Sequence, residues 1–129
     1  MILIKLLIQA FELASCMYVY RGMSKMQLKK YDSAIKDFDA ALHLELKLEI
    51  AYYNRGKSKC QLNDFKGDLN DYNEVLNFNP RDTIVYKLIA WTNNHIENWT
   101  EAIKAYSELI LIDSNNASAL DSRGWINAS

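Results

Sequence analysis

The residues best suited to metal binding or acid–base chemistry are few and widely separated. The two cysteines stand far from both histidines, so no spacing typical of a zinc site occurs. Carboxylates do recur in close pairs, but the solvated faces of helices commonly carry such pairs. The sequence also lacks a Gly-rich phosphate loop, a nucleophile elbow and a His-Glu-x-x-His motif. We therefore expect no enzyme, no cofactor and no metal site. The residues considered are Cys16, Cys60, His43, His95, Asp37, Asp39, Asp68 and Asp71.

The composition indicates one helical domain. The chain has 129 residues, of which 50% are hydrophobic, with 4 Gly and 1 Pro. So few glycines and prolines favour long uninterrupted helices over a turn-rich β fold. The net charge of −1 lacks the basic excess typical of nucleic-acid binders. We expect a single domain over residues 1–129 that binds neither nucleic acid nor a small-molecule substrate.

One dipeptide reveals an internal period of thirty-four residues. Arg21-Gly22 recurs as Arg55-Gly56 and, two periods later, as Arg123-Gly124, whereas Ile89-Ala90 fills the intervening position. Several further columns keep the same spacing, which is much stronger support for a repeat than the dipeptide alone. These columns are Tyr31, Phe65 and Trp99; Leu28, Leu62 and Ile96; and Ala41, Val75 and Leu109.

Within each repeat, apolar residues step by three and four, as on one face of an α-helix. Polar breaks separate the runs, and Asp64, Asp82 and Asn98 are candidate helix caps. Each repeat is therefore predicted to be two antiparallel helices, here called the first and the second helix. The predicted divisions are a half repeat over 1–14, repeats over 15–48, 49–82 and 83–116, and a half repeat over 117–129.

These columns resemble the tetratricopeptide repeat (TPR) family. The family has a thirty-four-residue helix-turn-helix unit with a small residue in the first helix and aromatic and small residues in the second. The resemblance implies an all-α, right-handed solenoid of antiparallel helix pairs, with about eight helices. The matching residues are Gly22 and Gly56; Tyr31, Phe65 and Trp99; Ala34 and Ala102; Phe38, Tyr72 and Tyr106; and Pro80.

The repeat positions have a packing explanation. A small residue such as Gly22 or Gly56 lets the paired helix approach closely. Asp68 departs from the pattern, because it stands where the repeat has a small residue. A buried unpaired carboxylate is costly, so we expect Asp68 to turn outward; the alternative is a pairing with Arg55 or Lys59.

The two half repeats suggest an alternative structural function. Residues 1–14 fall in the phase of a second helix, and residues 117–129 fall in the phase of a first helix. Neither has the polar composition of a capping helix. The chain is either a fragment of a longer array or a homo-oligomer whose terminal half repeats join neighbouring chains.

The amino-terminal segment leaves the cellular location open. Residues 1–14 are apolar but interrupted by Lys5 and Glu12, and too short to span a bilayer. We expect a cytoplasmic protein in which both cysteines are packed inside. The alternative is a bacterial lipoprotein with the lipid on Cys16, because residues 13–16 (LASC) resemble the cleavage box of that class.

The TPR resemblance also implies where a partner would bind. In that family the first helices line a concave groove that takes a peptide or helix of another protein. One subfamily binds the terminal carboxylate of a peptide there through a set of Lys, Arg and Asn residues. Only Asn54 matches that set, so this mode of binding is not expected. We predict a non-catalytic protein-interaction scaffold whose groove is rich in aromatic residues and lysine. The predicted groove residues are Tyr20, Met23, Tyr53, Asn54, Lys57, Lys87 and Trp91.

Overall fold

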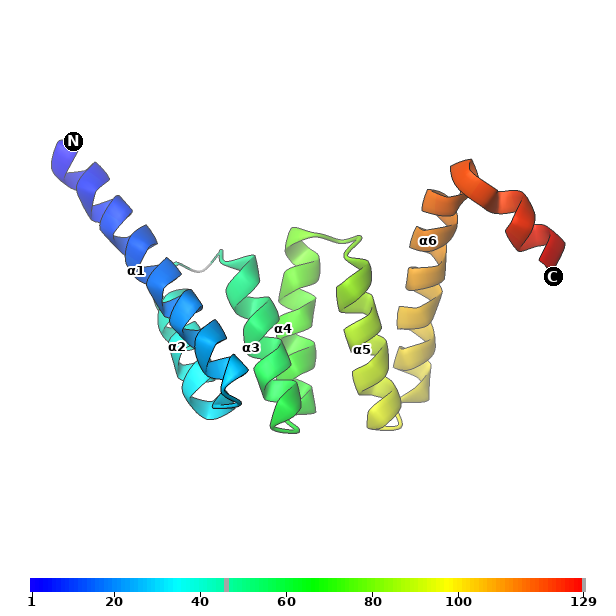
Figure 1. Ribbon diagram of the computed structural model, residues 1–129, viewed down its shortest axis with the longest axis horizontal. Coiled ribbons are helices and arrows are strands. Elements are labelled where there is room, and N and C mark those ends of the chain that lie inside the picture. Colours follow the sequence, from blue (N-terminus) through cyan, green and yellow to red (C-terminus); the bar gives the residue numbers. More distant parts are fainter. Residues whose placement is uncertain (46, 129) are drawn as a thin grey trace. The chain divides into compact units, whose positions relative to one another are not determined.

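The computed structural model consists of helices throughout the part of the chain that it describes, residues 1–45 and 47–128, with side chains described as far as residue 114. Figure 1 shows these helices in chain order. Their bounds are α1 Ile2–Gln27, α2 Tyr31–Leu44, α3 Glu49–Gln61, α4 Phe65–Phe78, α5 Thr83–His95 and α6 Trp99–Ala128.

The prediction of about eight helices is wrong for the described residues, which form six. The predicted half repeat over residues 1–14 is not a separate helix, because α1 runs from Ile2 to Gln27 without a break. The physical reason is that no Gly or Pro lies near the expected boundary at residues 14 and 15, so nothing there ends the helix. The side chains of the predicted half repeat over 117–129 lie outside the described residues.

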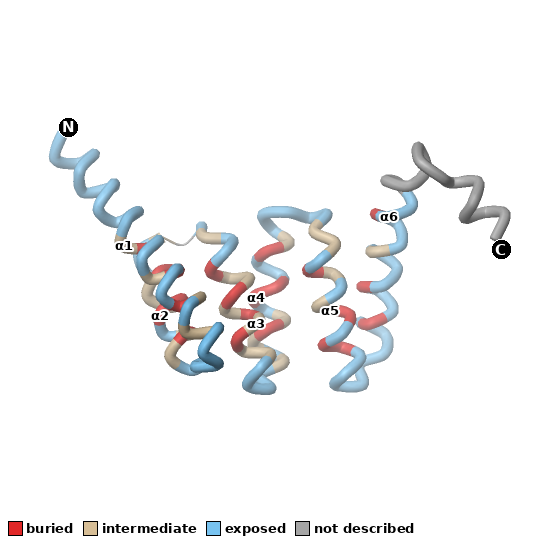
Figure 2. Tube along the Cα trace, in the orientation of Figure 1, coloured by how far each residue is buried: buried red, intermediate tan, exposed pale blue. Residues whose placement is uncertain are grey.

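Contacts divide the chain into two compact units, residues 1–78 and 79–129. In the first unit, α1 packs against α2 and α3 packs against α4, and α2 joins these two helix pairs through α3. The shared core contains Phe38, Ala41 and Leu42 of α2 together with Ala51 of α3. Figure 2 shows the buried positions on the facing sides of these helices. The helix pair and its neighbour thus bury one common apolar seam, as a stacked repeat must.

The second unit is the pair α5 and α6. Val85 and Ala90 of α5 are fully buried, and Ala102 and Ala105 of α6 are nearly so. Small residues at these positions allow the two helix axes to approach closely. The third repeat therefore keeps the packing pattern of the first two.

The turns inside the three helix pairs share one backbone conformation. Lys29, Asn63 and Glu97 all have a left-handed backbone, with φ of 61°, 64° and 63°. In each turn the next residue donates its backbone N–H to a carbonyl five residues back, for example Lys30 to Lys25 at 2.8 Å. This is a Schellman cap, which usually has glycine at the left-handed position. The thirty-four-residue period is thus a backbone period as well as a sequence period.

Two of the three predicted caps are confirmed. The Asp82 side chain accepts a hydrogen bond from the backbone N–H of Val85 at 3.1 Å, and Asp64 accepts one from Gly67 at 3.0 Å. Each carboxylate satisfies an N–H that the first helical turn leaves open. No side-chain hydrogen bond of Asn98 occurs among the described residues.

The left-handed turns yield a stability prediction. Replacing Lys29 or Glu97 with Gly should raise the free energy of unfolding by about 1 kcal/mol, since the left-handed conformation costs a non-glycine residue roughly that much. Asn63→Gly should gain less, because Asn tolerates this conformation. Urea unfolding followed by circular dichroism measures these changes. Lys30→Gly is the control: the backbone φ of Lys30 is −93°, so the change should destabilise. Equal gains at Lys29 and Lys30 would refute the explanation.

Candidate functional site

The arginine of each Arg-Gly pair in the first unit binds an aspartate on the partner helix. Arg21 donates from Nε and Nη2 to the two carboxylate oxygens of Asp37, at 2.9 and 2.7 Å. Arg55 makes the same two bonds to Asp71, at 2.9 and 2.7 Å. We call this fork the Arg–Asp clasp; its geometry is that of a bidentate charge-assisted pair.

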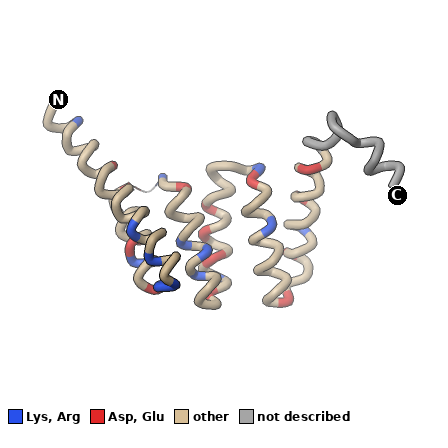
Figure 3. Tube along the Cα trace, viewed as in Figure 1, with Lys and Arg blue, Asp and Glu red and all other residues tan. Residues whose placement is uncertain are grey.

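A lysine one helical turn further along completes each clasp. Lys25 lies 3.0 Å from Asp37, and Lys59 lies 3.3 Å from Asp71. The hydrogen bonds from Arg21 lower the pKa of Asp37, which keeps this nearly buried carboxyl charged. Figure 3 shows basic positions of α1 and α3 alongside acidic positions of α2 and α4. The two cations per carboxylate compensate the cost of removing it from water.

Arg55 also joins the first repeat to the second. Its Nη1 donates to Asp39 of α2 at 2.8 Å while its other nitrogens bind Asp71 of α4. Burial alone would lower the pKa of Arg55, but the bonds to Asp71 and Asp39 outweigh burial and raise it. One side chain therefore connects three consecutive helices: α2, α3 and α4.

The third repeat replaces both members of the clasp. Ile89 stands at the position of Arg55, and Ala105 stands at the position of Asp71. Ala105 is nearly buried and Ile89 is half-buried. The irregular copy of the dipeptide is therefore part of a paired change, in which two charged residues give way to two apolar ones.

The glycine beside each arginine lies against the aromatic residue beside each aspartate. A Cβ atom on Gly22 would come within 2.7 Å of the Phe38 ring, and one on Gly56 within 2.7 Å of the Tyr72 ring. Both rings are buried, so they have little room to move. This confirms that the glycines mark the close approach of the paired helices.

Asp68 does not turn outward, and that expectation is wrong. It is completely buried. The two cations considered as its partners, Arg55 and Lys59, bind Asp71 instead. Burial, and to a lesser extent the charge of Asp68, raises the pKa of Tyr72 above its ordinary value. The local reason is position: Asp68 lies one turn before Tyr72 on the same inward face of α4.

The predicted groove residues of the first unit differ in exposure. Tyr20 on α1 is 64% exposed, whereas Met23 is half-buried and packs against the core. Lys57 of α3 lies over the Tyr53 ring, 5.3 Å from its centroid, and both side chains are half-buried. Asn54 is nearly buried, and its side-chain amide donates to the backbone carbonyl of Ile50 at 2.9 Å. Tyr20, Tyr53 and Lys57 therefore offer the accessible surface.

The remaining two predicted groove residues belong to α5 in the second unit. Lys87 is exposed, and Trp91 is 51% exposed. The Trp91 ring stacks on His95, with centroids 4.9 Å apart and planes 8° from parallel. Because His95 is one turn further along α5, the stack keeps the Trp91 ring at a defined orientation on the helix surface.

Comparison with solved structures identifies the fold. The chain matches MamA with a TM-score of 0.77 at 17% identity, over 81% of this chain and 61% of that one. It also matches the first TPR of Spaghetti (RPAP3), in a structure with the HSP90 peptide SRMEEVD, with a TM-score of 0.72 at 20% identity, over 91% of this chain and 95% of that one. The fold is that of a TPR domain. The Arabidopsis OM64 TPR domain matches with a TM-score of 0.71 at 16% identity, over 86% of this chain and 92% of that one. The TPR2B domain of yeast Sti1, in a complex with pHsp70, matches with a TM-score of 0.72 at 14% identity, over 87% of this chain and 90% of that one.

At the sequence level no protein-family model and no curated protein matches the chain. The TPR likeness thus lies in the backbone and in packing positions. The repeat columns keep residue size and shape, and most other positions differ, as the identities of 14–20% with these TPR structures indicate.

Among the described residues, no group of three or more His, Cys, Asp or Glu could hold a metal ion. Cys60 is half-buried, but Cys16 is exposed, so the expectation that both cysteines pack inside is wrong for Cys16. Cys16 follows Ser15, which faces α2 and takes the buried position of this turn.

Sequence reasoning missed the Arg–Asp clasp, although a signal was present. Asp37 and Asp71 each follow an Arg-Gly arginine by sixteen residues, and the third repeat loses both members together. Sixteen residues is the distance from the middle of a first helix, around the turn, to the facing position on the second. Paired changes at that offset would have indicated the contact.

The clasp predicts a strong coupling between its two members. Arg55→Ile alone should lower the free energy of unfolding by about 3–5 kcal/mol, because it leaves the nearly buried Asp71 carboxylate undercompensated. Adding Asp71→Ala, which reproduces the third repeat, should recover much of that loss. A double-mutant cycle measured by urea unfolding gives the coupling energy.

The matched control is the exposed pair Lys104 and Glu101, 3.2 Å apart on α6. Its coupling energy should be below about 0.5 kcal/mol, as is usual for surface pairs on a helix. Additive effects of the substitutions at Arg55 and Asp71 would contradict the interpretation of the clasp.

Proposed function

We propose that this protein is a non-catalytic protein-interaction module that binds an extended or helical segment of another protein along its first helices. The observation that carries the proposal is the Lys57–Tyr53 stack on α3, in which a cation and an aromatic ring are held together at a partly accessible surface. Aromatic residues and Met are favoured at recognition surfaces, and half-exposed rings lose little conformational freedom on binding.

Equivalent positions of the other first helices carry further residues of this kind. The thirty-four-residue period relates Met23, Lys57 and Trp91 as one column, and relates Tyr53 to Lys87 as another. The lysines favour a partner segment with acidic residues, and the rings favour apolar or aromatic anchors within it. Solved TPR structures with bound peptides, such as that of Spaghetti with SRMEEVD, support a peptide as the class of ligand.

Recognition here should not depend on a free carboxyl terminus. Val19 and Met23, and likewise Ile84 and Leu88, occupy positions where carboxylate-binding TPR domains would have polar residues. The Asn54 amide, the one matching residue, donates to its own helix. We infer that the chain takes an internal acidic segment, held by side-chain contacts along the helices.

Peptides selected from a random display library on the immobilised chain would test this function. Binding of a selected peptide, measured by fluorescence anisotropy, should weaken about tenfold or more with Lys57→Glu and with Trp91→Ala, because a charge contact or an aromatic anchor is lost. Amidating the peptide's carboxyl terminus should change its affinity less than twofold, which is well below one charge-assisted hydrogen bond.

Two substitutions serve as matched controls. Lys36→Glu alters an exposed lysine on α2, and Trp99→Ala removes a tryptophan that is 55% exposed at the start of α6. Neither should affect peptide binding. If the control substitutions weaken binding as much as those at Lys57 and Trp91, the first helices are not the binding surface.

The location of the protein is proposed to be cytoplasmic, with a lipoprotein form as the alternative. Supporting the alternative, α1 is long and apolar enough to cross a membrane by length and composition, and Cys16 is exposed. Intact-mass spectrometry of the protein from its native source separates the two forms. A chain that begins at an acylated Cys16 would establish the lipoprotein and refute the cytoplasmic form.

A further inference from the structure

The contact between α2 and α3 shows what normally covers a first helix in this fold. Ala51 and Ser58 of α3 are completely buried, and Ala51 packs in the core beside Phe38 and Leu42 of α2. Arg55, one turn after Ala51, reaches back to α2 through its bond to Asp39. The covering element is therefore a second helix with an apolar face and a carboxylate.

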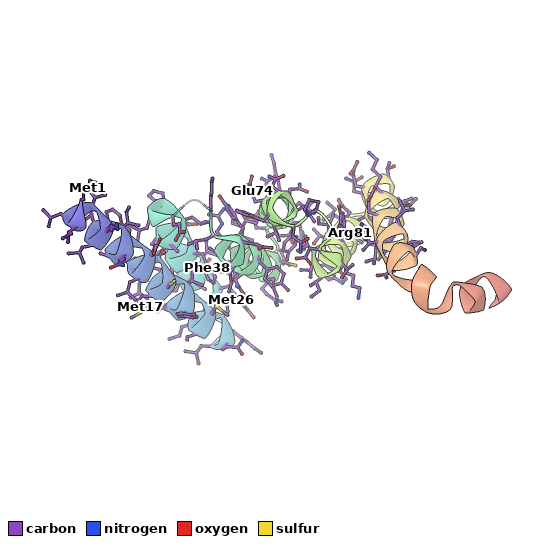
Figure 4. All side chains as sticks on the ribbon, turned by 90° about the horizontal axis from the view of Figure 1, so that it is seen from above. Met1, Met17, Met26, Phe38, Glu74 and Arg81 are labelled. Atoms are coloured by element: carbon purple, nitrogen blue, oxygen red, sulfur yellow. The ribbon has the colours of Figure 1, made fainter. Side chains whose placement is uncertain are left out.

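The corresponding positions on α1 are uncovered. Thirty-four residues before Ala51 stands Met17, which is 62% exposed and points away from α2 (Figure 4). The Arg21 side chain is 60% exposed, against 18% for Arg55. The nitrogen of Arg21 that corresponds to the Asp39-binding nitrogen of Arg55 has no hydrogen bond among the described residues. We call this stripe of Met17, Tyr20, Arg21 and Ser24 the α1 face.

Part of the surface of α6 is also apolar and exposed. Ala102, Ala105 and Ile112 of α6 are nearly buried, and α6 packs against α5. Ile103, Tyr106 and Ile110 lie elsewhere on the helix and are 64%, 44% and 57% exposed. Two periods earlier these three positions are Ile35, Phe38 and Leu42 of α2; Phe38 and Leu42 belong to the core cluster that also contains Ala51 of α3. We call the exposed three the α6 face.

We propose that the α6 face of one copy of this chain packs on the α1 face of a second copy. The contact repeats between molecules the packing that α2 and α3 make within one molecule. The α1 face carries Arg21 and Ser24 among its apolar residues, so it suits an amphipathic helix and is unsuited to lipid hydrocarbon. Met17 and Tyr20 are of types that favour protein interfaces.

The chemistry of the contact sets its strength. Ser107 of α6 stands where α2 has Asp39, so a hydroxyl meets Arg21 in place of a carboxylate. The contact between copies is thus weaker than the one inside the first unit. Because the two faces differ, each molecule keeps one free face after pairing, and association continues head to tail.

Sedimentation over a concentration series tests the proposal with the full chain. The average mass of the wild-type protein should grow with concentration beyond that of a dimer. Met17→Glu and Ile110→Glu should each give monomers, since each places a charge in the contact. An equimolar mixture of the two variants should form a heterodimer and nothing larger, because the mixture retains one intact pair of faces.

The controls alter exposed apolar residues outside both faces. Leu7→Glu on α1 and Ile84→Glu on α5 should associate like the wild type. The proposal is overturned by a wild-type protein that stays monomeric up to millimolar concentration, by a mixture that stays monomeric, or by dissociation through Leu7→Glu.

Two further variants keep the test decisive if a glutamate variant does not fold. In a chain with Cys16→Ser and Cys60→Ser, Met17→Cys in one copy should form a disulfide with Ile110→Cys in another under mild oxidation. Separately, Ser107→Asp should tighten association by at least about tenfold through a new bond to Arg21. Adding Arg21→Gln should abolish that gain. No cross-link in the mixture, or no effect of Ser107→Asp, would show that the two faces do not meet.

Discussion

The contact between an Arg-Gly pair on a first helix and an Asp-aromatic pair on its second helix is the constraint on which the first unit depends. Arg55 and Asp71 form the ionic half, and Gly56 and Tyr72 form the packing half one residue further along each helix. The glycine lets the helices approach, and the approach places the carboxylate within reach of the guanidinium. Each half would be weaker without the other.

The third repeat shows that the ionic half has an apolar alternative. Ile89 and Ala105 replace the pair while Ala90 keeps the small position, and the helix pair still forms. This agrees with the general finding that a buried ion pair and a well-packed apolar pair can be equally stable.

The same arginine column also connects the first two repeats within the first unit. Arg55 links the first repeat to the second through Asp39. The residues one period after Asp39 and Arg55 are Asn73 and Ile89, both uncharged. The boundary between the units falls between these residues, after Phe78.

Much of the fold could be predicted from the spacing of residue types. Gly22, Phe38 and Tyr72 fall in columns that the period alone reveals, and they pack as expected. The helix count could not be predicted, because the period marks where a helix should end and residues 14 and 15 contain nothing that ends one. The candidate site could be predicted in part. The exposure of rings such as Tyr20 follows from their position in the thirty-four-residue repeat, whereas the hydrogen bond of the Asn54 side chain to its own helix does not.

The amino-acid sequence by itself determined the helix pair, its period and the positions of close approach, because these depend on residue size at fixed spacing. Only the tertiary structure decided which partners the charged side chains have and how far they are buried. Asp37, Asp39, Asp68 and Asp71 look alike as acidic residues of polar helices, yet two are clasped by arginine, one joins two repeats and one is completely buried. The energy of a charge depends on burial and on partners distant in sequence, and neither is a property of local spacing.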